Sequence, residues 1–171
     1  MRRLLITLLV MPFGVFAQQA AWKNIDQTAY KLSYPGDWVL DEGGQMGTRF
    51  ILFSALESTE DLFKENVNLI IQDLTGYNLD LDKYAQLSEN QIKSMITNVN
   101  IIEHKRVSTG AVPHYKIIYT GDQGAFKLTF EQYYFVKDNK AYVLTFTSEQ
   151  KNFEKYKADG EKILESFALK G

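Results

Sequence analysis

Residues 126–148 read FKLTFEQYYFVKDNKAYVLTFTS, and this stretch decides the fold class. Two of its segments, Phe126–Val136 and Ala141–Ser148, are predicted to be long strands. Between them, Asp138-Asn139 is a residue pair that tolerates the left-handed conformations of a two-residue hairpin turn. The stretch therefore predicts an antiparallel hairpin.

The turn also predicts which residues of the hairpin face one another. The predicted cross-strand pairs are Val136 with Ala141, Phe135 with Tyr142, Tyr134 with Val143, and Tyr133 with Leu144. Because side chains alternate along a strand, Tyr134 and Val143 lie on one face of the sheet, and Tyr133 and Leu144 on the other. Both faces are apolar near the turn. We therefore expect something to cover each face, since a sheet with one face in water would not need two apolar faces.

Two helices are expected to provide these covers. Asp80 is a predicted N-cap of a helix that extends to Val99, and Thr147-x-x-Gln150 resembles a capping box for a second helix near the C-terminus. Each helix has an apolar stripe at helical spacing: Leu81, Tyr84, Ala85, Ile92, Met95, Ile96 and Val99 in the first, and Phe153, Tyr156, Ile163, Leu164 and Phe167 in the second. The predicted fold class is α+β, a mostly antiparallel β-sheet sandwiched between helices in α/β/α layers.

Shorter strands are predicted elsewhere from alternating apolar residues and from turn residues at their ends. They span residues 30–34, 38–40, 49–53, 66–74, 101–107 and 115–119. No internal repeat, low-complexity stretch or Pro/Ser-rich linker divides the chain. We therefore expect a single domain over residues 18–171.

The first 17 residues have the three parts of a secretory signal peptide. Arg2 and Arg3 supply the positive charge, Leu4–Val10 the apolar region, and Ala17 the residue before the cleavage site, which leaves Gln18 as the new N-terminus. The apolar run is shorter than the roughly 20 residues that a membrane-spanning helix needs. The sequence thus predicts a soluble exported protein, periplasmic or extracellular, with no transmembrane segment in its mature form.

Composition excludes several classes of function. Removing 17 of the 171 residues, two of them basic, leaves 154 residues with 17 basic and 21 acidic side chains, a net charge of −4. A mildly acidic chain without a basic cluster argues against nucleic-acid binding. The absence of cysteine excludes disulfides, thiolate nucleophiles, iron–sulfur clusters, Cys-ligated zinc and a lipid anchor on cysteine.

Four segments in this order resemble PsbP-like proteins, a family whose fold class includes DcrB-like bacterial envelope proteins. They are YKLSYPGDW at residues 30–38, NVNLI at 66–70, AYVLT at 141–145 and ILESF at 163–167. The resemblance implies a β-sheet sandwiched by helices and a binding or assembly role rather than catalysis. PsbP itself is an extrinsic lumenal subunit of photosystem II that supports calcium and chloride retention. Fold alone does not settle function.

Two groups of residues are candidates for metal binding. If residues 101–107 and 115–120 pair, the two histidine rings could approach one another. An acidic loop could offer oxygen ligands to calcium, but it lacks the Asp-x-Asp-x-Asp-Gly spacing of a specific site, and a lysine interrupts it. The candidate residues are His104 and His114 in the first group, and Glu57, Glu60, Asp61 and Glu65 in the second. The default expectation is strand-end histidines and a solvated acidic loop, with no metal or other cofactor.

No nucleophile elbow, phosphate-binding loop or His-Glu-x-x-His motif occurs, so we do not expect an enzyme. The ten Tyr and eleven Phe residues could, beyond forming the core, line a pocket between sheet and helix. The sequence therefore predicts a non-catalytic accessory protein that binds an unidentified protein partner in the envelope. The alternative is a carrier of a small apolar ligand or lipid, and an enzyme ranks third.

Overall fold

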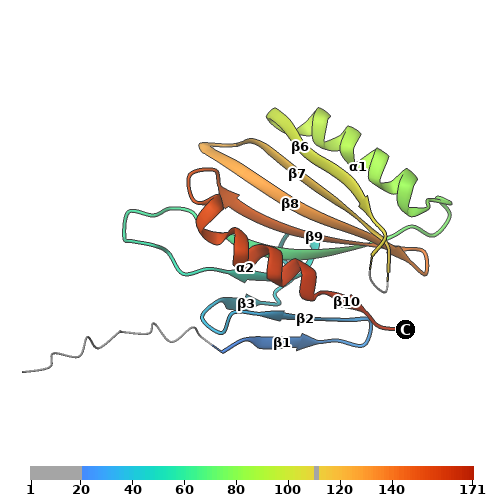
Figure 1. The fold of residues 1–171 in the computed structure, drawn as a ribbon, viewed down its shortest axis with the longest axis horizontal. Coiled ribbons are helices and arrows are strands. Elements are labelled where there is room, and N and C mark those ends of the chain that lie inside the picture. The colour runs from blue at the N-terminus through green and yellow to red at the C-terminus, as the bar shows by residue number, and fades with distance from the viewer. Residues whose placement is uncertain (1–20, 110–111) are drawn as a thin grey trace, which may run out of the picture.

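A computed structural model describes residues 21–109 and 112–171, arranged around a seven-stranded antiparallel sheet (Figure 1). Strand order across the sheet is β3–β4–β5–β9–β8–β7–β6. The strands are β3 Val39–Asp41, β4 Thr48–Phe53, β5 Asn66–Asp73, β6 Thr97–Val107, β7 His114–Gln123, β8 Phe126–Lys137 and β9 Lys140–Glu149, and a short 3₁₀ turn, η1 Gln45–Gly47, precedes β4. The predicted signal cleavage between Ala17 and Gln18 lies outside the described residues.

The β8–β9 hairpin has the predicted register. Tyr134 pairs with Val143, and Tyr133 pairs with Leu144. Asp138 has a φ angle of 51°, and the turn residue after it has a φ angle of 54°, so both adopt the left-handed conformation. The turn chemistry therefore sets which side chains enter which layer.

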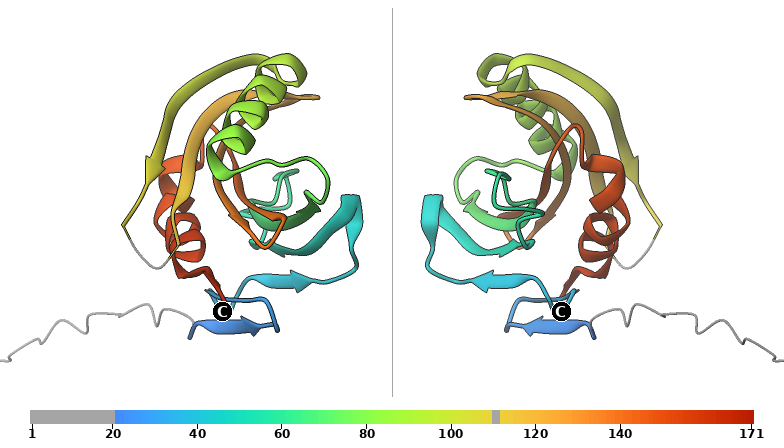
Figure 2. Two further views of the ribbon diagram at one scale, coloured as in Figure 1. Left: turned by 90° about the vertical axis from the view of Figure 1, so that its right-hand side faces the viewer. Right: turned by 90° about the vertical axis from the view of Figure 1, so that its left-hand side faces the viewer.

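Each face of the sheet has its own cover, as expected (Figures 1 and 2). Helix α1, Leu81–Met95, packs on the face that carries Tyr134 and Val143. Helix α2, Phe153–Ser166, packs on the face that carries Tyr133 and Leu144. A second, three-stranded sheet of order β1–β2–β10 extends this second cover, with β1 Lys23–Asp26, β2 Tyr30–Tyr34 and β10 Ala168–Leu169. The predicted α+β sandwich is thereby confirmed.

The helix boundaries were predicted only in part. Asp80 caps α1, since its Oδ1 accepts a hydrogen bond of 2.8 Å from the backbone N–H of Lys83. The helix ends at Met95, and Val99 belongs to β6. The capping box at Thr147 was wrong, because that residue lies within β9 and is paired on both sides, whereas α2 begins at Phe153.

Neither helix in the described part of the chain is both long enough and apolar enough to cross a membrane.

Candidate functional site

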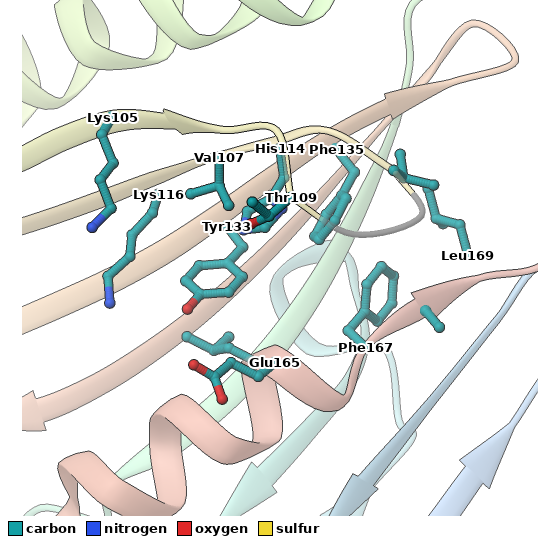
Figure 3. A pocket seen from close by; sticks show the side chains of 13 residues that line it. Lys105, Val107, Thr109, His114, Lys116, Tyr133, Phe135, Glu165, Phe167 and Leu169 are labelled. Atoms are coloured by element: carbon teal, nitrogen blue, oxygen red, sulfur yellow. The ribbon is translucent and has the colours of Figure 1, made fainter.

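A cavity of about 520 Å³ lies between the sheet and the C-terminal segment (Figure 3). We call it the C-terminal pocket. Its lining comes from β6, β7 and β8 on one side, and from the end of α2 and β10 on the other. The side chains that line it are Lys105, Val107, Thr109, Val112, His114, Lys116, Tyr133, Phe135, Leu164, Glu165, Phe167, Ala168 and Leu169.

Antiparallel pairing brings the sheet side of the pocket together. Val107 on β6 pairs with His114 on β7, and Lys116 on β7 pairs with Tyr133 on β8. Paired residues in neighbouring strands point to the same face, so these side chains all face α2. The pocket thus depends on the register of three strands.

The end of α2 fixes the opposite side of the pocket. Ser166 Oγ accepts a hydrogen bond of 2.8 Å from the backbone N–H of Ser33 on β2, and donates to the Ile163 carbonyl at 2.7 Å. The ring of the next residue, Phe167, has its centroid 5.7 Å from that of the Tyr30 ring and 5.2 Å from that of the Phe135 ring. The Ser-Phe sequence therefore holds the end of the helix against both sheets.

Three rings stack along the sheet side of the pocket. His114 lies between Tyr133 and Phe135, with centroid distances of 4.8 and 4.9 Å. Burial lowers the pKa of His114, and the charge of nearby Lys116 lowers it further. The hydrogen bond with the Val112 backbone acts in the opposite direction and raises this pKa. His114 is therefore neutral at physiological pH and contributes an aromatic surface rather than a charge.

A buried ion-pair cluster adjoins these rings. Lys116 Nζ lies 2.7 Å from Glu131 Oε1 and 3.1 Å from Glu161 Oε1. Glu131 is fully buried, and burial raises the pKa of its carboxyl group against the lowering effect of Lys116. Burial alone would lower the pKa of Lys116, but the two carboxylates outweigh it and hold that pKa above its usual range. The ammonium group is thus charged and already paired within the chain.

Comparison with protein families gives a match over residues 17–169, to the family described as PsbP-like protein. The chain belongs to the PsbP-like family. A comparison with curated protein sequences found no match.

Solved structures of low sequence identity share this PsbP-like fold. Cyanobacterial PsbP (CyanoP) from Synechocystis sp. PCC 6803 is 14% identical, with a TM-score of 0.61 over 95% of this chain and 99% of that one. LpqN of Mycobacterium tuberculosis, a protein involved in cell envelope biogenesis, is 13% identical, with a TM-score of 0.66 over 88% of this chain and 92% of that one. PA94 from Pseudomonas aeruginosa is 8% identical, with a TM-score of 0.62 over 88% of this chain and 98% of that one. At these identities the likeness shows the fold alone.

The two histidines of this PsbP-like chain do not meet. β6 and β7 do pair, with His104 opposite Ile117 and Val107 opposite His114. His104 faces α1, where its Nδ1 contacts Glu89, whereas His114 faces the C-terminal pocket. The rings therefore lie on opposite faces of the sheet.

The acidic loop divides into exposed and buried members. Glu60 is exposed, Glu57 pairs with Lys155 at 2.9 Å, and Asp61 accepts hydrogen bonds from loop backbone N–H groups. The prediction of a solvated loop was wrong for Glu65, which is fully buried and has a pKa that burial raises. Ser54, Ser148 and Asn152 surround its carboxylate at 3.3–3.5 Å. Within residues 21–109 and 112–171, no three His, Asp or Glu side chains group as a metal site would require.

The sequence interpretation missed the Lys116–Glu131 pair. Its signal was present, because Glu131 lies two and four residues before Tyr133 and Phe135 on the same face of β8. A charged residue on an otherwise apolar face of a central strand requires a partner.

Proposed function

We propose that this protein is an exported, non-catalytic accessory protein that acts by binding a protein partner in the periplasm or envelope. The observation that carries the proposal is the C-terminal pocket, a cavity between the sheet and the end of α2 that is lined mostly by aromatic and aliphatic side chains. Concave apolar sites with a few polar groups bind small molecules, and peptide segments of protein partners dock in apolar grooves and pockets.

The ionisable side chains of the pocket favour binding over catalysis. General acid–base catalysis needs a group whose pKa lies near the working pH and which can reach a substrate. Lys116 is held in an ion pair, and His114 is stacked between two rings in its neutral form. Lys116 is therefore not free to exchange a proton with a substrate near pH 7, and His114 presents a ring surface rather than a charge. The PsbP-like relatives, LpqN among them, are in line with an accessory role in the envelope.

A second candidate function is the transport of a small apolar ligand or lipid. The pocket volume of about 520 Å³ supports it, because small-molecule sites typically measure about 300–1,000 Å³.

Crosslinking in the native envelope followed by affinity capture separates the two functions. We expect a stoichiometric protein partner that is lost in a Val107→Trp variant, which fills the pocket without adding charge, and kept in a Leu62→Trp control in the exposed loop. Lipid that copurifies with the wild-type chain and is lost from Val107→Trp would instead support the carrier function. Mass spectrometry of the captured protein should give Gln18 as its first residue, and an intact Met1 would contradict export by cleavage.

A further inference from the structure

We propose that the partner binds through an extended basic segment, which pairs with the outer edge of β6 and places a Lys or Arg side chain beside Glu165. This inference rests on the proposed function, and it names the chemistry of the partner. Three features of the pocket carry it: its charge, its rings and the strand edge at its side.

The charge of the pocket favours a cation. Both lysines that line it are already paired within the chain, Lys105 with Glu103, and Lys116 with Glu131 and Glu161. Glu165 is the remaining charged side chain among those that line the pocket. Among the residues that the structure describes, Glu165 has no ion-pair partner and is exposed at the pocket. A ligand cation would therefore compensate a charge that the chain leaves unbalanced.

The geometry of α2 places the acidic groups together. Glu161 and Glu165 are four residues apart, so they lie one turn apart on the same side of the helix. Glu161 reaches Lys116 on the sheet, which shows that this side of α2 faces β7. Glu165 and Tyr133 line the same pocket, where burial raises the pKa of Tyr133 and the charge of Glu165 is among the causes that raise it further (Figure 3). A cation that enters between α2 and the sheet would thus meet a carboxylate.

The stacked rings favour a cation carried on an apolar stem. Tyr133, His114 and Phe135 present ring surfaces to the pocket, and Lys116 Nζ already lies 5.8 Å from the Tyr133 ring centroid. A guanidinium group can stack on a ring while it pairs with a carboxylate, and the stem of a Lys side chain packs on apolar surfaces.

The strand edge at the side of the pocket favours an extended peptide over a free amine. β6 is the last strand of the seven-stranded sheet, and no strand in residues 21–109 and 112–171 pairs with its outer side. Its pairing with β7 shifts at two points in the first half of the strand, but is regular from Glu103 to Val107. Bulges and charged side chains both protect an edge against pairing. The part from Glu103 to Val107 has no bulge, and its charged side chains are held in ion pairs within the chain, Glu103 with Lys105 and Arg106 with Asp82.

This regular part of the edge adjoins the pocket. Lys105 and Val107 line the pocket, whereas His104 and Arg106 contact acidic residues of α1. In a peptide strand added beside β6, alternate side chains would lie next to Lys105 and Val107, over the space between β6 and α2. Main-chain hydrogen bonds would supply affinity, and the pocket would select the side chain.

Nuclear magnetic resonance titration with two capped peptides tests the inference. Each has about eight residues, the length of an ordinary strand, with Val alternating with Lys in one and with Glu in the other. We expect the Lys peptide to bind, with the largest shift changes at the amides of β6 and at the pocket. Glu165→Gln should weaken this binding about two- to fivefold, as expected for a partly exposed ion pair. The matched control Glu154→Gln removes an exposed carboxylate at the other end of α2 and should leave binding unchanged.

Several outcomes would overturn the inference. They are equal or tighter binding of the Glu peptide, equal effects of the two glutamate variants, shift changes away from β6, and no binding of the Lys peptide at millimolar concentration. None of them would refute the proposed function, which fails only if the envelope experiment yields no protein partner that depends on the pocket.

Discussion

Gly160 lies on the buried side of α2 and faces the ring of Phe146 on β9. A Cβ atom at residue 160 would lie 2.5 Å from Phe146 Cδ1, 2.6 Å from Cε1 and 2.7 Å from Cγ. The ring cannot turn away freely, because Phe146 is fully buried and stacks on Phe153 at a centroid distance of 5.8 Å. Gly160→Ala should therefore push α2 away from the sheet and widen the C-terminal pocket.

Two opposing effects set the magnitude for Gly160→Ala. In an exposed helix the change would stabilise the protein by about 1 kcal/mol, because glycine is a poor helix former. Overpacking a well-packed core costs about 1–3 kcal/mol. Since three atoms of a rigid ring are involved, we take the upper end of that range. The expected net loss in the free energy of unfolding is about 2 kcal/mol.

Urea denaturation of purified protein measures this loss. The matched control is Ala158→Gly at an exposed position of the same helix, which should cost about 1 kcal/mol through helix propensity alone. Phe146→Leu should also destabilise the Gly160→Ala variant less than it destabilises the wild-type protein, because residues 146 and 160 are in contact. If Gly160→Ala stabilised the protein by about 1 kcal/mol, as in an exposed helix, the packing of α2 described above would be wrong.

Three further predictions concern the core, the pocket and metals. Leu144→Ala should cost about 2–5 kcal/mol, because Leu144 is fully buried between Leu69 and Tyr133, and a loss below about 0.5 kcal/mol would contradict its burial. Because burial lowers the pKa of His114 in the folded state, the unfolded state binds more protons, and stability should fall as the pH drops through the unfolded pKa of about 6.5. Denaturation at several pH values should show a weaker pH dependence for His114→Gln, and an unchanged profile would refute the assignment. Thermal melts with chelator and with added calcium or zinc should agree within error, whereas a rise of several degrees at micromolar metal would point to a site in the Glu57–Glu65 loop.

Local sequence predicted the features that depend on neighbouring residues. The register of the β8–β9 hairpin follows from Asp138-Asn139, because a two-residue turn fixes which residues of the two strands lie opposite one another. The start of α1 follows from Asp80, whose side chain caps the helix. In contrast, β1 was missed, because Ile25 is its single buried residue and a strand of four residues offers no alternation to detect.

The features that the sequence did not predict depend on pairing between strands that are far apart in the chain. Thr147 and Gln150 have the spacing of a capping box, yet strands on both sides of β9 pair with Thr147 and keep it in the sheet. The histidines lie on paired strands, but the register places His104 opposite Ile117 and thus on the face away from His114. The C-terminal pocket combines three strands with the end of α2, so no single stretch of sequence contains it.

Site-specific photocrosslinking in the native envelope tests most directly whether the C-terminal pocket binds a protein partner. A photoreactive residue in place of Val107, at the pocket, is compared with one in place of Leu62, which is 83% exposed in the loop before β5. The account predicts one discrete protein adduct from residue 107, reduced by Glu165→Gln, and no such adduct from residue 62. Lipid adducts alone at residue 107, or the same protein adduct from both positions, would contradict it.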